Sequence, residues 1–316
     1  MEDSLQKKPF KKSNDSMNRI YHIINSRAAY QAALGLGRAL PPVVGYALAD
    51  LISGLMSRMP HLAPVRAVRL NQWIAHDRQP DARELDHLTR ETLRSAARAV
   101  YDFAHWKDHP QVLKKRVQVE ESFLKVAEKA RNREHGVILA LPHMTNPDLL
   151  GWVSAPLFGR LTAIAPNRLL EGYQVQNQLR RQVGIEVIPG SLEAVRTALT
   201  RLRDGEAVVF GVDRPFADSA FRPRFFGIPA ALPVAHVRVA LKLDLPIYVV
   251  GAALKDNQRI SLWASELTLQ RFPDPQEEIL ANAEAVLEVV MGNIRQFPVQ
   301  WNMTFPVWPD WMDQVP

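Results

Sequence analysis

Apolar and polar residues alternate in two different ways along the chain, and the change falls near residue 135. In the first part, apolar residues recur every three or four positions, which is typical of helices. This spacing predicts helices over residues 43–59, 81–107 and 113–133. In the second part, short apolar runs alternate with segments of helical spacing. The pattern there predicts strands at residues 137–141, 160–165, 185–189 and 207–212, helices over 169–183, 191–203 and 275–295, and a hairpin of 247–254 and 259–267.

Strands that alternate with helices predict an α/β fold with a central mixed, largely parallel sheet flanked by helices. An N-terminal amphipathic helical region precedes this sheet. We divide the chain into a flexible basic tail of residues 1–18, a helical region of residues 19–134 and an α/β core of residues 135–316. The core is expected to be continuous with the helices before it.

The helix predicted over residues 43–59 is amphipathic. Its large apolar residues form a stripe made of Val44, Ala47, Leu48, Leu51, Ile52, Leu55 and Met59. Two interpretations stand: the stripe packs on the core of the domain, or it lies in a membrane interface. Pro41, Asp50 and Arg58 interrupt the apolar residues of this region, so no helix that spans a bilayer is predicted.

Composition narrows the class of protein and its partners. The chain has 316 residues, of which 47% are hydrophobic, and this supports a sizeable packed core. Its net charge of +6 suits anionic partners such as phospholipid headgroups, nucleic acid or a phosphorylated carrier. Cysteine is absent, which excludes disulfides, zinc bound by cysteine and cysteine nucleophiles. Residues 1–18 are polar and rich in lysine and show no secretory signal.

The strand predicted at residues 137–141 leads into a candidate catalytic pair, His143 and Asp148. Asn146 and Pro147 have the pattern of an N-cap and the first turn of a helix. The strand end therefore brings His143 to the edge of the sheet, and the helix start holds Asp148 nearby. A carboxylate that accepts one imidazole N–H leaves the other ring nitrogen free to take a proton from a hydroxyl. The alternative is a hydrogen-bonded loop histidine without a chemical role.

A second strand end also carries charged residues. Asp213 and Arg214 follow the strand predicted at residues 207–212, which again brings polar groups to a sheet edge. The segment that follows contains Arg222, Arg224, Phe225, Phe226 and Gly227. Asp213 and Arg214 could instead form a local ion pair, and we expect the two phenylalanines to pack in the core.

Several other chemistries are disfavoured. His105 and His109 are four residues apart, a spacing that can hold zinc, but Pro110 follows and we expect a solvated helix end, so no metal site is predicted. The chain contains no GxSxG elbow and no P-loop, and Gly35-Leu-Gly37 lacks the third glycine of a dinucleotide fingerprint. No recognisable module supports binding to nucleic acid.

These features together resemble the lipid A biosynthesis lauroyl/myristoyl acyltransferase family, which includes the phosphatidylinositol mannoside acyltransferases. The resemblance runs from about Leu34 to Trp301. It rests on the order and spacing of His143 and Asp148, the Asp213-Arg214 strand end, the Phe225-Phe226-Gly227 turn and the segment Phe297-Pro-Val-Gln-Trp301. It implies a glycerol-phosphate-acyltransferase-like fold, in which residues 19–134 associate with a membrane and residues 135–316 are catalytic.

The resemblance implies transfer of a fatty acyl group from acyl-CoA or acyl carrier protein to a hydroxyl of a lipid or glycolipid. It implies that His143 is the general base and Asp148 its orienting carboxylate, and that Asp213 is an acidic residue near the site that steers the histidine instead or in addition. Residues expected to contact substrate are Asn146, Asn167, Arg168, Arg180, Arg214, Arg222 and Arg224.

The expected partners are an anionic membrane lipid and the acyl donor; no cofactor and no nucleic acid are expected. The expected location is the cytoplasmic face of the cell membrane, with peripheral or weak attachment. Two other functions stay open at this point. The pair could hydrolyse an acyl thioester, with water in place of the acceptor, or the protein could bind anionic lipid without catalysis.

Overall fold

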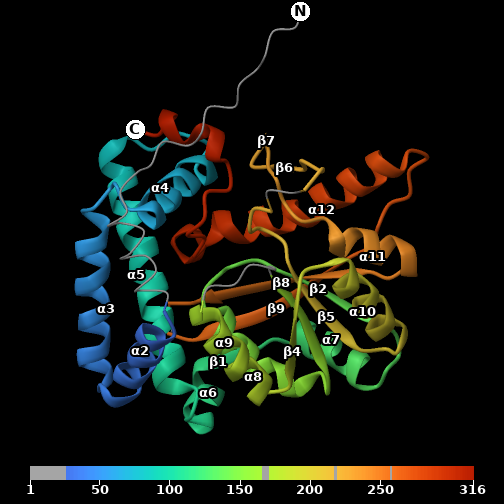
Figure 1. Ribbon diagram of the computed structural model, residues 1–316, viewed down its shortest axis with the longest axis horizontal. Coiled ribbons are helices and arrows are strands. Elements are labelled where there is room, and N and C mark those ends of the chain that lie inside the picture. The colour runs from blue at the N-terminus through green and yellow to red at the C-terminus, as the bar shows by residue number, and fades with distance from the viewer. Residues whose placement is uncertain (1–25, 166–170, 217–218, 257) are drawn as a thin grey trace, which may run out of the picture.

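Figure 1 shows the computed structural model, which describes residues 26–165, 171–216, 219–256 and 258–316. A seven-stranded sheet forms the centre and helices flank it, so the predicted α/β fold is confirmed. The helices beside the sheet at the N-terminal end of the chain are α2 (Arg27–Ala39), α3 (Pro42–Ser57), α4 (Ala63–Ala75) and α5 (Ala82–Trp106).

Five strands of the sheet run parallel, and two run the opposite way at one edge. Across the sheet the strands are β1 (Val117–Val119), β9 (Ile260–Leu267), β8 (Ile247–Leu254), β2 (Val137–Leu141), β5 (Ala207–Gly211), β3 (Leu161–Ala165) and β4 (Ile185–Pro189). β9 pairs antiparallel with β8 and parallel with β1, whereas the strands from β8 to β4 are mutually parallel. The sheet is therefore mixed and largely parallel, as predicted. A separate antiparallel pair consists of β6 (Arg224–Phe225) and β7 (Ile228–Pro229).

Both faces of the sheet are buried, and β2 shows how. Ile138 and Ala140 point into one core, and Val137 and Leu139 point into another. The first core includes residues of α10 (Leu192–Arg203), α11 (Ala235–Leu243) and α12 (Pro275–Gln296), and the second includes residues of α7 (Glu121–Arg131) and α8 (Pro147–Ser154). A strand that is covered on both sides has a continuous apolar sequence, which is why the pattern predicted it.

The prediction of a single helix over residues 113–133 is wrong. The chain there forms α6 (Pro110–Arg116), then β1, then α7. Val117 is buried and pairs with Ile260 of β9. β-branched valines suit a strand, and this pairing with a distant segment overrides the local helical spacing. The pattern also predicted no element where α2, α4 and α11 lie. The remaining elements are α9 (Glu171–Gln182) and the short helices η1 (Ala155–Leu157), η2 (Pro298–Gln300) and η3 (Pro309–Gln314).

α3 corresponds to the helix predicted over residues 43–59, and the structure tests one of the two interpretations of its stripe, packing on the core. The small residues Gly45, Ala49 and Ser53 form its buried side, whereas the residues of the predicted stripe are exposed. The stripe does not pack on the core. In the ranges that the structure describes, none of the helices combines the length and the apolar content needed to cross a bilayer.

Candidate active site

His143 and Asp213 meet because their strands are neighbours in register. β2 and β5 are parallel, and the last pair of residues between them is Leu141 opposite Gly211. His143 and Asp213 each follow that pair by two residues, so the two chains deliver them to the same place at the carboxyl edge of the sheet. This is where open α/β sheets gather their ligand sites.

The two side chains form a short hydrogen bond within a wider set. Nδ1 of His143 lies 2.7 Å from Oδ1 of Asp213, and the backbone N–H of His143 donates to Oδ2 at 2.8 Å. The indole Nε1 of Trp301 donates to the same Oδ2 at 2.8 Å. The Asp213 side chain is fully buried, whereas 37% of the His143 side chain is exposed. Nδ1 therefore carries a proton toward the carboxylate, and Nε2 is the ring nitrogen left as a hydrogen-bond acceptor.

Asp213 is held as a carboxylate although it is buried. Burial alone would raise its pKa, but the facing His143 and the hydrogen bonds from His143 and Trp301 outweigh that effect. The pKa of Asp213 is therefore lowered below its ordinary value. A partner that is ionised at neutral pH fixes the tautomer of the imidazole and stabilises the ring when it becomes charged.

A C-terminal segment holds the loop that carries His143. The backbone N–H of Asn302 donates to the carbonyl of His143 at 2.9 Å, and the N–H of Thr145 donates to the carbonyl of Gln300 at 2.7 Å. Thr145 has a positive φ of 57°, a conformation that side chains other than glycine adopt rarely. The segment that the family resemblance singled out, ending at Trp301, thus fixes both the loop and the carboxylate.

Asp148 lies in a different environment from the one expected. It stands in the first turn of α8, where its Oδ1 accepts from Nε and Nη2 of Arg180 at 3.0 and 2.7 Å. Its Oδ2 accepts from the side-chain amide of Gln176 at 2.9 Å. Within the described residues, the carboxylate bonded to His143 is Asp213 and not Asp148, because the first turn of α8 turns the Asp148 side chain toward α9. Arg180, which was expected to contact substrate, forms an ion pair with this carboxylate, and its contact with substrate stays a prediction.

Asn146 was expected to contact substrate, which stays a prediction, and in the structure it makes two hydrogen bonds within the protein. It is buried and caps α8, accepting from the N–H of Leu149 at 3.1 Å. Its side-chain amide donates to the carbonyl of Ala99 in α5 at 2.7 Å. The predicted N-cap is therefore confirmed, and the same side chain joins the site loop to α5.

The arginines of the second segment make contacts of their own. The guanidinium of Arg214 stacks 3.8 Å from the ring centre of Phe305. Arg222 donates to the carbonyls of Ser219 and Phe221, and Arg224 to that of Gly227. None of these contacts joins an arginine to His143. The contact of the three arginines with substrate therefore stays a prediction. Asn167 and Arg168, the other two expected contacts, lie outside the described residues.

Phe225 and Phe226 pack in the core, as predicted. Both are buried, and Phe225 stacks on Trp308 with ring centres 5.5 Å apart. Phe225 also meets Trp301 edge to face at 5.8 Å. This aromatic cluster supports the indole that donates to Asp213, so the Phe-Phe-Gly turn acts on the site through packing.

His105 and His109 are close but are not arranged as a metal centre. Nδ1 of His105 lies 3.0 Å from the carbonyl of Gly37, and the ring stacks on Tyr101. Across the described ranges, no group of three or more histidine, aspartate or glutamate side chains is arranged to hold a metal ion.

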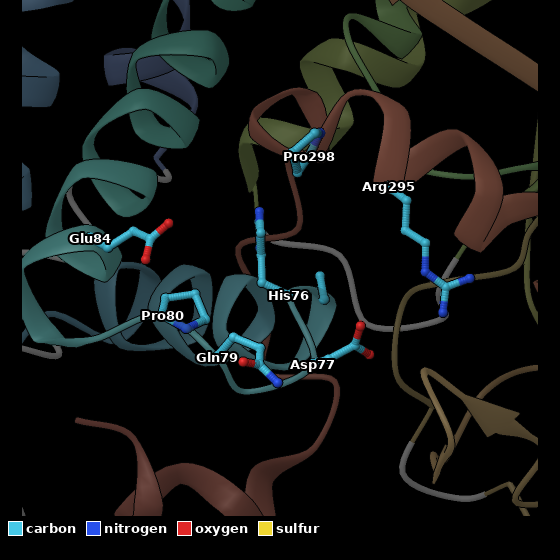
Figure 2. Close-up of a pocket in the computed structure, with 8 residues that line it drawn as sticks. His76, Asp77, Gln79, Pro80, Glu84, Arg295 and Pro298 are labelled. Atoms are coloured by element: carbon cyan, nitrogen blue, oxygen red, sulfur yellow. The ribbon is translucent and has the colours of Figure 1, made fainter.

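A surface cavity of about 320 Å³ adjoins the same C-terminal segment (Figure 2). His76 and Asp77 line it from the turn after α4, and Arg295 and Pro298 line it from the end of α12 and η2. The side chain of Gln72 donates to the carbonyl of Pro298 at 2.8 Å and so fixes this wall. None of the described residues predicted for the site lines the cavity. We therefore centre the site on His143 and not on this cavity.

The fold and the site define a class of protein: an α/β protein with a carboxylate-bound histidine at the carboxyl ends of parallel strands. The model of one family, described as bacterial lipid A biosynthesis acyltransferase, matches residues 30–309. The chain belongs to this family of acyltransferase enzymes, which confirms the resemblance seen in the sequence.

Proteins named phosphatidylinositol mannoside acyltransferase are similar to part of the chain. The one from Mycolicibacterium smegmatis (strain ATCC 700084 / mc(2)155) is 23% identical over 177 residues, which cover 55% of this chain and 57% of that protein. The one from Mycobacterium tuberculosis (strain CDC 1551 / Oshkosh) is 27% identical over 182 residues, which cover 55% and 54%. The chain thus spans about half the length of the curated relatives it matches.

Proposed function

We propose that the protein is an O-acyltransferase that moves a fatty acyl group from acyl-CoA or acyl carrier protein to a hydroxyl of a lipid or glycolipid. One observation carries the proposal: a buried carboxylate, Asp213, occupies Nδ1 of His143, and no residue in the described part of the chain bonds Nε2. The membership in an acyltransferase family and the names of the relatives support it.

The reaction follows from the two ring nitrogens. Nε2 of His143 takes the proton of the acceptor hydroxyl while the hydroxyl oxygen forms a bond to the carbonyl carbon of the thioester. The C–S bond then breaks, and the imidazolium gives the proton to the leaving thiolate. The products are an ester and a free thiol. Asp213 stabilises the imidazolium between the two proton transfers.

The acceptor supplies the nucleophile in this scheme. The chain has no cysteine, and it has no GxSxG elbow that would expose a serine. His143 therefore acts on the substrate hydroxyl directly, and Asp148, bound to Arg180, acts as a positioning residue for the start of α8.

We further infer that the reaction takes place at the cytoplasmic face of the cell membrane, with the protein bound peripherally. Both donors are water-soluble and carry phosphate, whereas a lipid acceptor stays in the bilayer. The net charge of +6 favours approach to anionic headgroups and to anionic donors.

The test measures acyl transfer by the purified protein from acyl-CoA and from acyl carrier protein to a panel of lysolipids and glycolipids, with products identified by mass spectrometry. His143→Ala should lower the rate at least about 100-fold, because a general base is removed. His87→Ala is the matched control, since His87 is exposed on α5. An unimpaired His143→Ala would overturn the assigned base.

Product analysis separates the competing functions. Free fatty acid without acylated lipid would mean that water replaces the acceptor and that the protein is a hydrolase. Binding to anionic vesicles without turnover of either donor would mean that it binds lipid without catalysis.

A further inference from the structure

α3 exposes its apolar side to solvent. Thirteen large apolar residues are exposed in the described part of the chain, and eight of them lie between Leu36 and Met59. They are Leu36 of α2 and Val43, Val44, Leu48, Leu51, Ile52, Leu55 and Met59 on α3 and the turn after it. Their exposure ranges from 37% for Leu48 to 83% for Val43. An apolar stripe of this kind on the outside of a soluble fold marks a surface that binds something.

The inner side of α3 is built from small and charged residues. A Cβ atom added to Gly45 would lie 2.0 Å from the ring of Tyr101, so the two helices touch too closely for any larger residue there. Asp50 receives four hydrogen bonds of 2.6 to 3.0 Å, two each from Arg94 and Arg98 of α5. The bonds from Arg98 and then Arg94 lower the pKa of Asp50 to about 2.

This inner side fixes the orientation of the helix. Rotating α3 to bury its leucines would break the two ion pairs of Asp50 and force large side chains against Tyr101. The outward stripe is therefore a built feature of the packing between α3 and α5, which lie side by side in Figure 1.

The charges around the stripe identify its partner. Asp50 is the only acidic residue in the sequence from Arg27 to Leu62, and its carboxylate is turned inward to α5. The exposed charged side chains on this stretch include Arg38, which is 69% exposed and lies 3.6 Å from Asp108, and Arg58 at the end of α3. The outward surface is thus apolar with cationic ends, which matches the acyl chains and anionic headgroups of a bilayer interface.

We propose that α3, together with Leu36 of α2, is the surface by which the protein docks on an anionic phospholipid bilayer. The helix lies along the interface, its leucines insert below the headgroups, and Arg38 and Arg58 contact the phosphates. This inference deepens the proposed function: a role of docking in catalysis rests on the proposed acyl transfer to a membrane lipid.

The docking surface and the active site share α5. Arg98 binds Asp50 of α3, and the next residue, Ala99, accepts a hydrogen bond from Asn146, three residues after His143. Docking through α3 therefore sets the direction from which the site loop meets the bilayer.

The experiment measures sedimentation of the full chain with vesicles of phosphatidylcholine, with and without phosphatidylglycerol. The double variant Leu51→Glu/Leu55→Glu should lower binding to the anionic vesicles at least about 100-fold, because two inserted leucines are lost. The matched control is Leu124→Glu/Leu192→Glu, which changes two exposed leucines elsewhere and should bind like the wild type. Arg58→Ala should weaken binding about fivefold, and only to the anionic vesicles.

Three outcomes would overturn the proposal: equal binding by the α3 variant and the wild type, equal loss in the control, or a wild-type dimer that the α3 variant splits into monomers. The last would make the stripe a contact between two copies. A short-chain water-soluble acceptor distinguishes failure of docking from failure of the proposed function. The α3 variant should keep turnover on it, whereas His143→Ala should lose turnover and still bind vesicles.

Discussion

Two regions of the molecule hold the two carboxylates that the sequence assigns to one histidine. Asp213, seventy positions from His143, lies buried at the end of β5 and binds its ring. Asp148, only five positions away, lies partly exposed at the start of α8 and binds Arg180. Register between parallel strands, and not distance along the chain, decides which carboxylate orients the imidazole.

The largest effect is expected from Asp213→Asn. The amide keeps the shape of the side chain but removes the charge that stabilises the imidazolium, so the rate of acyl transfer should fall at least about 100-fold, close to the loss in His143→Ala. Asp148→Asn, measured in the same assay, is the matched comparison. A larger loss in Asp148→Asn would reverse the roles of the two regions.

The stability difference between Asp213→Asn and the wild type should depend on pH. The folded protein lowers the pKa of Asp213 below its ordinary value of 3.8, so the carboxylate contributes stability that is present above that value and is lost as the pH falls through the folded-state pKa. The variant should unfold more easily than the wild type at neutral pH. In urea unfolding curves the gap should narrow as the pH is lowered from about 5 toward about 2. A gap that widens over this range would contradict an ionised Asp213.

Trp301→Phe should have the next largest effect. It removes the indole donor to Asp213 and keeps an aromatic ring in the cluster, so turnover should fall about tenfold, the size expected for one hydrogen bond to a charged group. Trp308→Phe is the matched control, because Trp308 is equally buried and its Nε1 donates to the carbonyl of Ile228 instead. Equal losses in both variants would reduce the role of Trp301 to packing.

Much of the fold could be predicted from the sequence, because strands buried on both faces are continuous apolar runs. β1 was missed because it has three residues and its partner, β9, lies far along the chain. His143 was found because it lies two positions after the end of a strand. The bond from Asp213 to His143 was only one of two alternatives, since β2 and β5 are neighbours in the sheet but are separated in the chain by β3 and β4.

The positions of His143 and Asp213 just after two strands were the sequence signal that could have favoured Asp213. Both residues stand two positions after the end of their strand, but the offset has meaning only once the strands are known to be adjacent. The sequence also did not show which side of α3 is exposed, because that depends on Arg94 and Arg98 of another helix. In both cases the missing information is a tertiary contact between segments that are distant in the sequence.

Asp148→Asn should affect stability more than turnover. It weakens the contact between α8 and α9, so turnover should fall less than about tenfold, whereas the free energy of unfolding should fall by about 1 kcal/mol for a partly exposed ion pair. A double-mutant cycle with Arg180→Gln, measured by urea unfolding, isolates the pair. A coupling energy near zero would mean that the two side chains act independently.

His236→Leu should leave turnover unchanged and serves as the contrast to His143. Both ring nitrogens of His236 are buried without a partner within the described structure, and burial lowers the pKa of this histidine from 6.5 to about 3. The folded protein therefore holds the ring neutral, while the unfolded chain binds a proton below pH 6.5. Wild-type stability should fall as the pH drops through that range, by about 1.4 kcal/mol per pH unit.

Leucine binds no proton and leaves no polar atom unpaired, so His236→Leu should gain stability relative to the wild type, with an additional gain of roughly 2 kcal/mol between pH 6.5 and about pH 5. Thermal unfolding at the two pH values measures the gap. A constant gap would mean that His236 is protonated in the folded state. Burial would then not be enough to keep a histidine neutral in this fold when no carboxylate lies beside it.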